Sequence, residues 1–506
     1  MSEEQKDIQT STEAKNDTSS YRSIFKATSL FGGVQLWKIL ITIVQTKFVA
    51  LILGPGGMGI KGLYSSATSL IQSITAMGLS NSAVRDVSEA NGTGDLKRVS
   101  YVVAVLRRLV WLTGLLGMIA VIVLSPILSN TTFGDYSYTV PFIILSVTLL
   151  LAQLTAGQNV ILQGTRRLKY LAKAGVIGSV VSLIITVPFY YLWGVKGIVP
   201  TMVLEALSLF FLAWYYSRKV KLESVQVTLK ESLKEGRGMM SLGLVMTYNS
   251  MLVLGCSYVI RVFITRTGGI GDVGLFNAGF AVVNTYVGLI FSAMTTDYYP
   301  RLAAVSHDNL KFGDVVNQQL EVSLLIIGPM LLLFLLIAPW AVIALYSTKF
   351  LPIVGYMKWA SLGIIFKTIS WAISYQFIAK GDKKAFAINE TVINIISLAT
   401  KIIGYYLWGV TGLGISFFVT YVIYTLIVYV VAHRKYEYIF VTEVKKMILI
   451  QLVCLVPVFL LLYLWQTWWA YMLSVLVLII VCYYSYRELD KRLNLKQVLA
   501  QLRRKK

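Results

Sequence analysis

Charge is scarce in this sequence. Only 14% of its 506 residues are charged and 56% are hydrophobic, whereas a soluble globular domain carries roughly 25% charged residues. A soluble protein of this size would need a charged exterior, but the few charges here cluster between long apolar runs. The composition therefore excludes a soluble enzyme and predicts an integral membrane protein.

Acidic residues are scarcer still, with 24 against 46 basic residues and a net charge of +22. Such an excess can indicate nucleic-acid binding. Lysine and arginine also collect in the cytoplasmic loops of membrane proteins. Because the basic residues lie between the apolar segments, we expect no nucleic-acid partner.

Residues that bind metals or form disulfides are few, with three cysteines and two histidines. Cys256, Cys454 and Cys482 lie inside apolar runs, and His307 and His433 lie far apart. Their spacing fits neither a disulfide framework nor a metal motif. We therefore expect no metal site.

Long apolar runs, by contrast, are abundant. They are too long for the strands of an outer-membrane barrel. The sequence predicts an all-α polytopic membrane protein with about 14 transmembrane helices, each needing about 20 apolar residues. The predicted spans are 28–53, 61–83, 101–128, 139–163, 171–192, 197–217, 239–264, 274–297, 318–346, 353–379, 386–407, 411–432, 446–465 and 468–485.

The basic residues also predict the topology. Gaps after the even-numbered spans carry most of the lysine and arginine, and by the positive-inside rule these gaps are cytoplasmic. Both termini are then cytoplasmic, and the polar residues 1–22, which include several acids, are predicted to be disordered. The opposite gaps hold only Lys196, Arg266, Lys349 and, at a border, Lys61.

The chain repeats itself at a fixed offset. Residues 190–197 read YYLWGVKG and residues 405–412 read YYLWGVTG. The glycine-rich turn 54–60 matches the turn 269–275 in the same register, since 405 − 190 and 269 − 54 both equal 215. Six spans per repeat is an even number, which predicts two parallel repeats that form two lobes. Two further helices follow at the C-terminus.

These patterns divide the chain into six parts. The predicted parts are a cytoplasmic N-terminal tail (1–27), an N-lobe (28–217), a basic cytoplasmic linker (218–238), a C-lobe (239–435), the last two helices (436–486) and a basic cytoplasmic tail (487–506).

Several charged residues fall inside the predicted spans. Charge at this depth is costly, so it normally faces a cavity or a partner. Lys38 and Lys367 lie near the middle of their helices. The other cations are Lys47, Lys61, Arg261 and Lys401, and the acids Glu205 and Glu390 are the candidate charge partners. A cavity with excess positive charge is suited to an anion such as a phosphate or a carboxylate.

Other roles for these residues stay open. Lysine and arginine near a helix end can extend to the membrane interface, and a lysine can pair with an acid only to hold helices together. Neutral polar residues could line a wet cavity or bond across helices. These neutral residues are Gln35, Gln45, Gln153, Gln158, Asn249 and Asn284.

The order of several short motifs resembles a known family. In the first half these are Leu53-Gly54-Pro55 with Gly59, Gly78-Leu79 and Val84-Arg85; in the second they are Tyr299-Pro300, Lys349-Phe350, Trp359, Lys367, Tyr375, Ile378-Ala379-Lys380 and Glu390. Residues 28–435 resemble the polysaccharide branch of the multidrug/oligosaccharidyl-lipid/polysaccharide (MOP) exporter superfamily. Within that branch they are similar to the Wzx-type O-antigen translocases, which include the enterobacterial common antigen lipid flippase.

The resemblance implies a function. Such proteins flip an undecaprenyl-diphosphate-linked oligosaccharide, for example a lipopolysaccharide O-antigen unit, across the cell inner membrane by alternating access between two lobes. Lys367 and Glu390 match charged positions of the family pattern, whereas Lys38 and Arg261 follow from depth alone. The expected partners are this polyprenyl-diphosphate-linked glycan, membrane lipids and other polysaccharide assembly proteins, and the expected state is a monomer. Many family members stop at twelve helices, and fourteen also resembles the lipid II flippases, which leaves the glycan open.

Two alternatives compete with this hypothesis. A cation-coupled multidrug exporter of the same fold tends to carry an acid in its first helix, where this chain has Lys38 and Lys47. A membrane polymerase or ligase needs a large outer loop or a paired acid and base, and the predicted outer loops are short. We therefore expect no enzyme, no catalytic residue and no cofactor.

Overall fold

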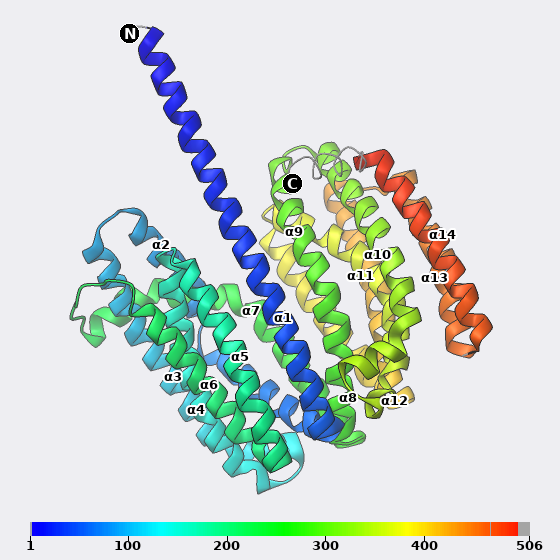
Figure 1. The fold of residues 1–506 in the computed structure, drawn as a ribbon, viewed down its shortest axis with the longest axis horizontal. Helices are drawn as coiled ribbons and strands as arrows, with labels where there is room; N and C mark the ends of the chain where they lie inside the picture. Colours follow the sequence, from blue (N-terminus) through cyan, green and yellow to red (C-terminus); the bar gives the residue numbers. More distant parts are fainter. Residues whose placement is uncertain (1–2, 466, 494–506) are drawn as a thin grey trace. The chain divides into compact units, whose positions relative to one another are not determined.

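The computed structural model describes residues 3–465 and 467–493, with side chains from Trp37 onward except at 245–246, 285–287, 289 and 493. This part of the chain is helical and contains no strand, which confirms the all-α fold. The helices are α1 (Glu3–Thr75), α2 (Leu79–Gly92), α3 (Leu96–Phe133), α4 (Thr139–Gly164), α5 (Leu168–Trp193), α6 (Ile198–Ser217), α7 (Leu229–Thr267), α8 (Ile270–Ala281), α9 (Val287–Ala304), α10 (Asn309–Leu345), α11 (Ile353–Ala379), α12 (Lys383–Tyr436), α13 (Thr442–Leu464) and α14 (Trp468–Leu493) (Figure 1).

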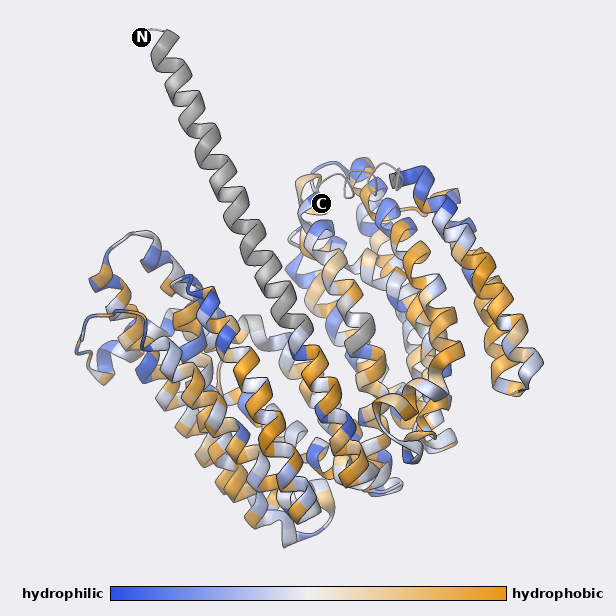
Figure 2. Cartoon of the chain, in the orientation of Figure 1, coloured by the Kyte–Doolittle hydropathy of each residue, from blue (hydrophilic) through white to orange (hydrophobic). Residues whose placement is uncertain are grey.

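The helices account for the predicted spans. Ten helical stretches of the described chain are long and apolar enough to cross a membrane, and Ile270–Asn284 is a shorter apolar one. Three stretches are bent and hold two predicted spans each, in α1, in α5 with α6, and in α12. Hydrophobic colour covers most of α13 and α14 and gives way to hydrophilic colour toward the end of α14 (Figure 2). The protein is a multi-pass membrane protein.

Three predicted elements differ from the structure. Residues 3–22, which belong to the segment 1–22 predicted to be disordered, are helical, and they include good helix formers such as glutamate, glutamine and lysine. The predicted span 61–83 ends at Thr75, because Gly78 adopts a left-handed conformation (φ 59°) and starts a separate helix, α2. The predicted span 274–297 is interrupted by a π-helical turn, Val282–Tyr286, between α8 and α9.

Helix α7 begins inside the predicted linker. The amide and hydroxyl of Thr228 donate to the Glu231 carboxylate at 2.7 and 2.8 Å, and the Glu231 amide donates to the Thr228 hydroxyl at 3.3 Å. This reciprocal pair is a capping box, which satisfies the free amides at a helix start. The Thr-x-x-Glu spacing at 228–231 was the sequence signal for this boundary.

Aspartate caps start two other long helices. The Asp95 carboxylate accepts from the amides of Lys97 and Arg98 at the start of α3. The Asp308 carboxylate accepts from the amides of Leu310 and Lys311 at the start of α10. The bond from the Lys311 amide is the largest cause that lowers the pKa of Asp308. Such caps stabilise a helix by about 1 kcal/mol.

The repeat seen in the sequence is also present in the backbone. Gly194 has φ 52° and ψ −130°, and Gly409, 215 residues later, has φ 58° and ψ −141°. Gly54 and Gly269, also 215 residues apart, have φ 62° and 99° with ψ near 180°. Only glycine adopts these positive-φ conformations readily. The shared octamer and glycine-rich turn therefore encode the same bends in both halves.

The chain forms two compact units. Unit 1 contains residues 1–53 and 64–251, and unit 2 contains residues 54–63 and 252–506. The unit boundary thus falls within α7 rather than in the linker 218–238, and the bend at Gly54 places a short part of α1 in unit 2. In unit 2, α11 packs against α10, α12 and α13, and α13 and α14 lie side by side along α10 (Figure 1).

Candidate functional site

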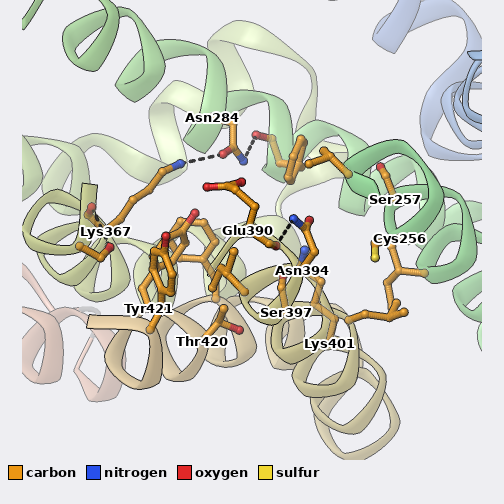
Figure 3. Close-up of a pocket in the computed structure, with 18 of the residues that line it drawn as sticks. Cys256, Ser257, Asn284, Lys367, Glu390, Asn394, Ser397, Lys401, Thr420 and Tyr421 are labelled. Carbon is orange, nitrogen blue, oxygen red and sulfur yellow. Dashed lines mark hydrogen bonds between the residues drawn. The ribbon is translucent and has the colours of Figure 1, made fainter. Parts of the chain in front are cut away.

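A cavity of about 330 Å³ lies within unit 2, between α7, α8, the π-helical turn, α11 and α12 (Figure 3). Its volume is at the lower end of the range of about 300–1,000 Å³ for ligand pockets. Lys367, Glu390 and Lys401, three of the charged residues predicted from depth, line it. The structure therefore gathers residues that the sequence separates by as many as 34 positions (401 − 367).

Helix α12 contributes a polar stripe to the cavity. Glu390, Asn394, Ser397 and Lys401 follow one another at spacings of four, three and four residues, and all four line the cavity. Residues at this spacing share one face of a helix. Figure 3 shows the four side chains along the same face of their helix. The stripe explains how one helix supplies both charges and neutral polar groups.

Lys367 on α11 lies at one end of the cavity. Its ammonium donates a hydrogen bond to the Asn284 side-chain oxygen at 3.0 Å. It also lies 5.5 Å from the centre of the Tyr421 ring and 5.6 Å from that of Phe417, within cation–π distance. Asn284 belongs to the π-helical turn, a feature that often marks functional sites. A third ring, Phe291, lies at 6.0 Å, so one neutral oxygen and three aromatic rings surround this charge.

Arg261 on α7 lies beside the cavity. Its Nε donates to the Asn277 side-chain oxygen at 2.8 Å, and its Nη1 donates to the carbonyl and hydroxyl oxygens of Ser257, a lining residue. The guanidinium lies 5.5 Å from the centre of the Phe276 ring. Neutral oxygens therefore hold Arg261 in place.

The charge balance of the site is positive. Lys367, Lys401 and Arg261 supply three positive charges, and Glu390 is the acid among the lining residues. In the described part of the chain, no carboxylate oxygen lies within 4.0 Å of the three cationic groups. Burial strengthens electrostatic interactions because the local dielectric is low. This arrangement is chemically suited to bind a multiply charged anion.

The other predicted charges lie elsewhere. Lys38, Lys47 and Glu205 belong to unit 1, and Lys61 belongs to the 54–63 segment of unit 2. The Lys38 ammonium lies against Gly175 of α5, where an added Cβ would be 2.3 Å from it. None of these four residues lines the cavity of unit 2.

Glu205 has neutral partners. One of its carboxylate oxygens accepts hydrogen bonds from Gln45 at 3.1 Å, Ser182 at 2.7 Å and Thr186 at 2.5 Å. No ion pair within 4.0 Å involves Glu205 in the described chain, so the structure does not bear out its expected pairing with a lysine. Hydroxyl and amide donors satisfy the carboxylate without a second charge. A charge-partner role for Glu390 stays a prediction.

The neutral polar residues divide between the two expected roles. Asn284 lines the cavity, whereas Gln45, Gln153 and Gln158 bond across helices, the last two to Thr113 at 2.9 Å and Ser217 at 2.6 Å. The buried side-chain oxygen of Asn249 has no partner among the described residues. The side chain of Gln35 lies outside the described ones.

Some residues of interest were not predicted. Asn394, Ser397 and Tyr421 line the cavity. The polar spacing along α12 was the signal that could have found Asn394 and Ser397. Lys358 on α11 is only 3% exposed, and its ammonium donates to the Leu462 carbonyl at 2.5 Å. That carbonyl lies in the last turn of α13, where a cation is favoured by the helix dipole. Lys358 thus ties α13 to α11 rather than serving the cavity.

Cys256 allows a direct test of the cavity's potential. It lines the cavity, whereas Cys482 is exposed. We expect a negatively charged methanethiosulfonate to modify Cys256 about tenfold faster than a positively charged one of similar size, because the nearby cations attract anions. Rates are measured by mass spectrometry on purified protein with Cys454→Ser. Cys482 is the internal control, and an equal ratio of rates at both cysteines would contradict a positive cavity.

Comparison with known proteins places this chain in a family. The family described as polysaccharide biosynthesis protein matches residues 48–355, more than half of the chain. No curated protein matches the sequence. Solved structures do match: the lipid II flippase MurJ in an inward closed conformation has a TM-score of 0.68 and 15% identity, covering 92% of this chain and 99% of that one.

A multidrug transporter is similar to nearly the same degree. An inward-facing MATE-family transporter of the MOP superfamily has a TM-score of 0.67 and 15% identity, covering 81% of this chain and 96% of that one. A MATE transporter in complex with MaL6 has a TM-score of 0.56 and 14% identity, covering 83% and 97%. The sequence match and the shared fold agree: the chain belongs to the polysaccharide biosynthesis protein family and has the fold of the MOP-superfamily transporters.

Proposed function

We propose that this protein flips an undecaprenyl-diphosphate-linked oligosaccharide, such as an O-antigen unit of lipopolysaccharide, across the cell inner membrane. The observation that carries the proposal is the cavity of unit 2, where Lys367 and Lys401 line the wall and Arg261 lies beside it without a carboxylate in contact. The family match and the fold shared with a lipid II flippase support it. Both termini are cytoplasmic in this proposal, and the protein acts as a monomer alongside other polysaccharide assembly proteins.

The diphosphate is the part of the substrate that needs neutralisation. Moving an uncompensated anion into a low-dielectric region is costly, and paired, hydrogen-bonded cations offset that cost. Lys367, Lys401 and Arg261 supply the charge, and Asn284 and Asn394 supply amide groups for the first sugar. A cavity of about 330 Å³ holds a diphosphate with little more, so the remaining sugars and the polyprenyl tail stay outside it.

Alternating access then moves the head group. The two six-helix lobes rock relative to one another and expose the bound head group first to the cytoplasm and then to the opposite side. Lys38, Lys47 and Lys61 are proposed as further contacts for the anion along its path. No bond is made or broken, so the protein needs neither a catalytic residue nor a cofactor.

Flipping can be measured in proteoliposomes that contain the purified protein and a fluorescent lipid-linked glycan. We expect transport of the diphosphate-linked glycan to exceed that of the same glycan on an uncharged polyprenol by about tenfold or more, since one charge-assisted hydrogen bond contributes about 1.5–3 kcal/mol. Transport is scored by the fraction of glycan that a membrane-impermeant lectin can bind.

The same experiment also tests the alternative function, the export of cationic drugs. The fold is shared with MATE transporters, so the same proteoliposomes are loaded with a cationic dye under a proton or sodium gradient. Gradient-driven dye export without glycan flipping would reject the flippase and favour a multidrug exporter. Equal movement of the charged and uncharged glycans would reject the anion-binding role of the cavity.

A further inference from the structure

A second basic cavity lies within unit 1. It has a volume of about 260 Å³ and lies between α3, α4 and α6. Two arginines line it, Arg107 on α3 and Arg218 directly after α6, together with Trp111, Gln158 and Trp214. These residues take no part in the anion cavity of unit 2.

The two arginines lie where apolar helix segments begin and end. Arg107 lies within the predicted span 101–128, where it and Arg108 precede the uncharged run 109–128 of α3. Arg218 follows Ser217, the last residue of α6. Trp111 and Trp214 are exposed beside them. Arginine and tryptophan together at the end of an apolar span are typical of the level of the lipid head groups. The excess of basic residues assigns this end to the cytoplasmic leaflet.

The positive charges in this cavity have no acidic partner in contact. The charge of Arg218 acts unfavourably on the charge of Arg107, and neither guanidinium lies within 4.0 Å of a carboxylate in the described chain. Arg218 stacks on the Trp214 ring at 4.2 Å, which fixes the plane of its guanidinium. The Gln158 oxygen accepts from Ser217 at 2.6 Å, and its amide nitrogen donates to no described group. The neighbouring Arg108 does not line this cavity.

We propose that this cavity binds the phosphodiester head group of an anionic phospholipid from the cytoplasmic leaflet. A guanidinium donates two parallel hydrogen bonds to phosphate oxygens, so Arg107 and Arg218 match such a group in charge and geometry. Val110, Leu154 and Phe210 give the cavity an apolar wall, and the exposed apolar surface of α3 continues from Trp111 to Ile119 and Val123. A lipid can place its phosphate against the two arginines and its acyl chains against the apolar surface of α3. A free phosphate can contact only the arginines. In this proposal the lipid stays bound to the protein and is not the transported substrate.

The test uses full-length protein, purified and delipidated in detergent, and native mass spectrometry with added phosphatidylglycerol, phosphatidylcholine or inorganic phosphate. We expect the double variant Arg107→Gln with Arg218→Gln to bind phosphatidylglycerol at least about tenfold more weakly than the original protein, at about 1 kcal/mol per arginine. Arg108→Gln is the matched control and should bind as the original protein does. The pair Arg107→Lys with Arg218→Lys keeps the charge, and its intermediate affinity would support bidentate recognition.

Four results would overturn the proposal. The first is undiminished phosphatidylglycerol binding by the double glutamine variant, and the second is equal binding of phosphatidylcholine. The third is displacement of the lipid by an equal concentration of inorganic phosphate, which would identify a soluble anion site. The fourth is a loss in Lys367→Ala as large as that in the double glutamine variant, which would place the lipid in unit 2. Because binding is measured without transport, failure here leaves the proposed flippase function untouched.

Discussion

Replacing Lys367 with alanine is expected to lower flipping of the diphosphate-linked glycan by about tenfold to a hundredfold, while the protein still accumulates in the membrane. The change removes the ammonium that donates to Asn284 at 3.0 Å and lines the cavity. A hydrogen bond between a charged donor and a phosphate contributes about 1.5–3 kcal/mol, which corresponds to that loss. Flipping is measured in proteoliposomes and by complementation of a flippase-null strain.

Two further variants separate charge from folding. Lys384→Ala is the matched control, because Lys384 is an exposed lysine in the first turn of α12 and does not line the cavity. It should flip the substrate as well as the original protein. Lys367→Arg keeps the charge in a larger and differently shaped group, and it should retain part of the activity. Full complementation by Lys367→Ala would refute the assignment of this lysine.

Adding a single methyl group at Gly274 is expected to destabilise unit 2 by about 2–3 kcal/mol, the cost of overfilling a packed contact. A Cβ at Gly274 would lie 1.8 Å from the Pro55 carbonyl oxygen, and a Cβ at Gly59 would lie 2.0 Å from the Ile270 carbonyl oxygen. The two glycine-rich turns of the repeat therefore contact each other backbone to backbone within unit 2. We expect Gly274→Ala and Gly59→Ala to lower the thermal midpoint of the purified protein by several degrees.

Each of these variants has a control one helical turn away. An added Cβ at Gly271 or at Gly56 meets no atom within 4 Å, and neither residue has a positive φ. Gly271→Ala and Gly56→Ala should therefore leave the thermal midpoint unchanged or raise it slightly, because alanine favours a helix. If all four variants behave alike, the close contact between the turns does not contribute to stability.

The sequence could predict the fold class because a membrane imposes its length requirement locally. Each span needs a long apolar run, and such a run can be recognised in the sequence without knowing which helices pack against it. The bends at Gly194 and Gly409 were likewise accessible, since each lies in the repeated octamer and needs a glycine. The end of α1 at Thr75 was missed because Gly78 lies within an apolar run and packs against Gly243, a contact distant in sequence.

The candidate site was only partly accessible from sequence. We identified Lys367, Lys401, Arg261 and Glu390 because each lies within a predicted span, and charged residues are rare inside membrane spans. Depth could not tell which of these residues share a cavity and which, like Glu205, are held by neutral donors from other helices. Neutral residues such as Asn394 gave no signal singly, since asparagine is common in many settings.

By itself the sequence determined the helical membrane fold, the repeat with its offset of 215 residues and the set of charges at membrane depth. These follow from hydrophobicity and glycine placement, which act within a single helix or turn. The tertiary structure alone decided that Lys367, Glu390 and Lys401 line one cavity, and that Arg107 and Arg218 line another. Which side chains meet depends on how helices rotate and pack, and packing is set by contacts between segments far apart in the chain.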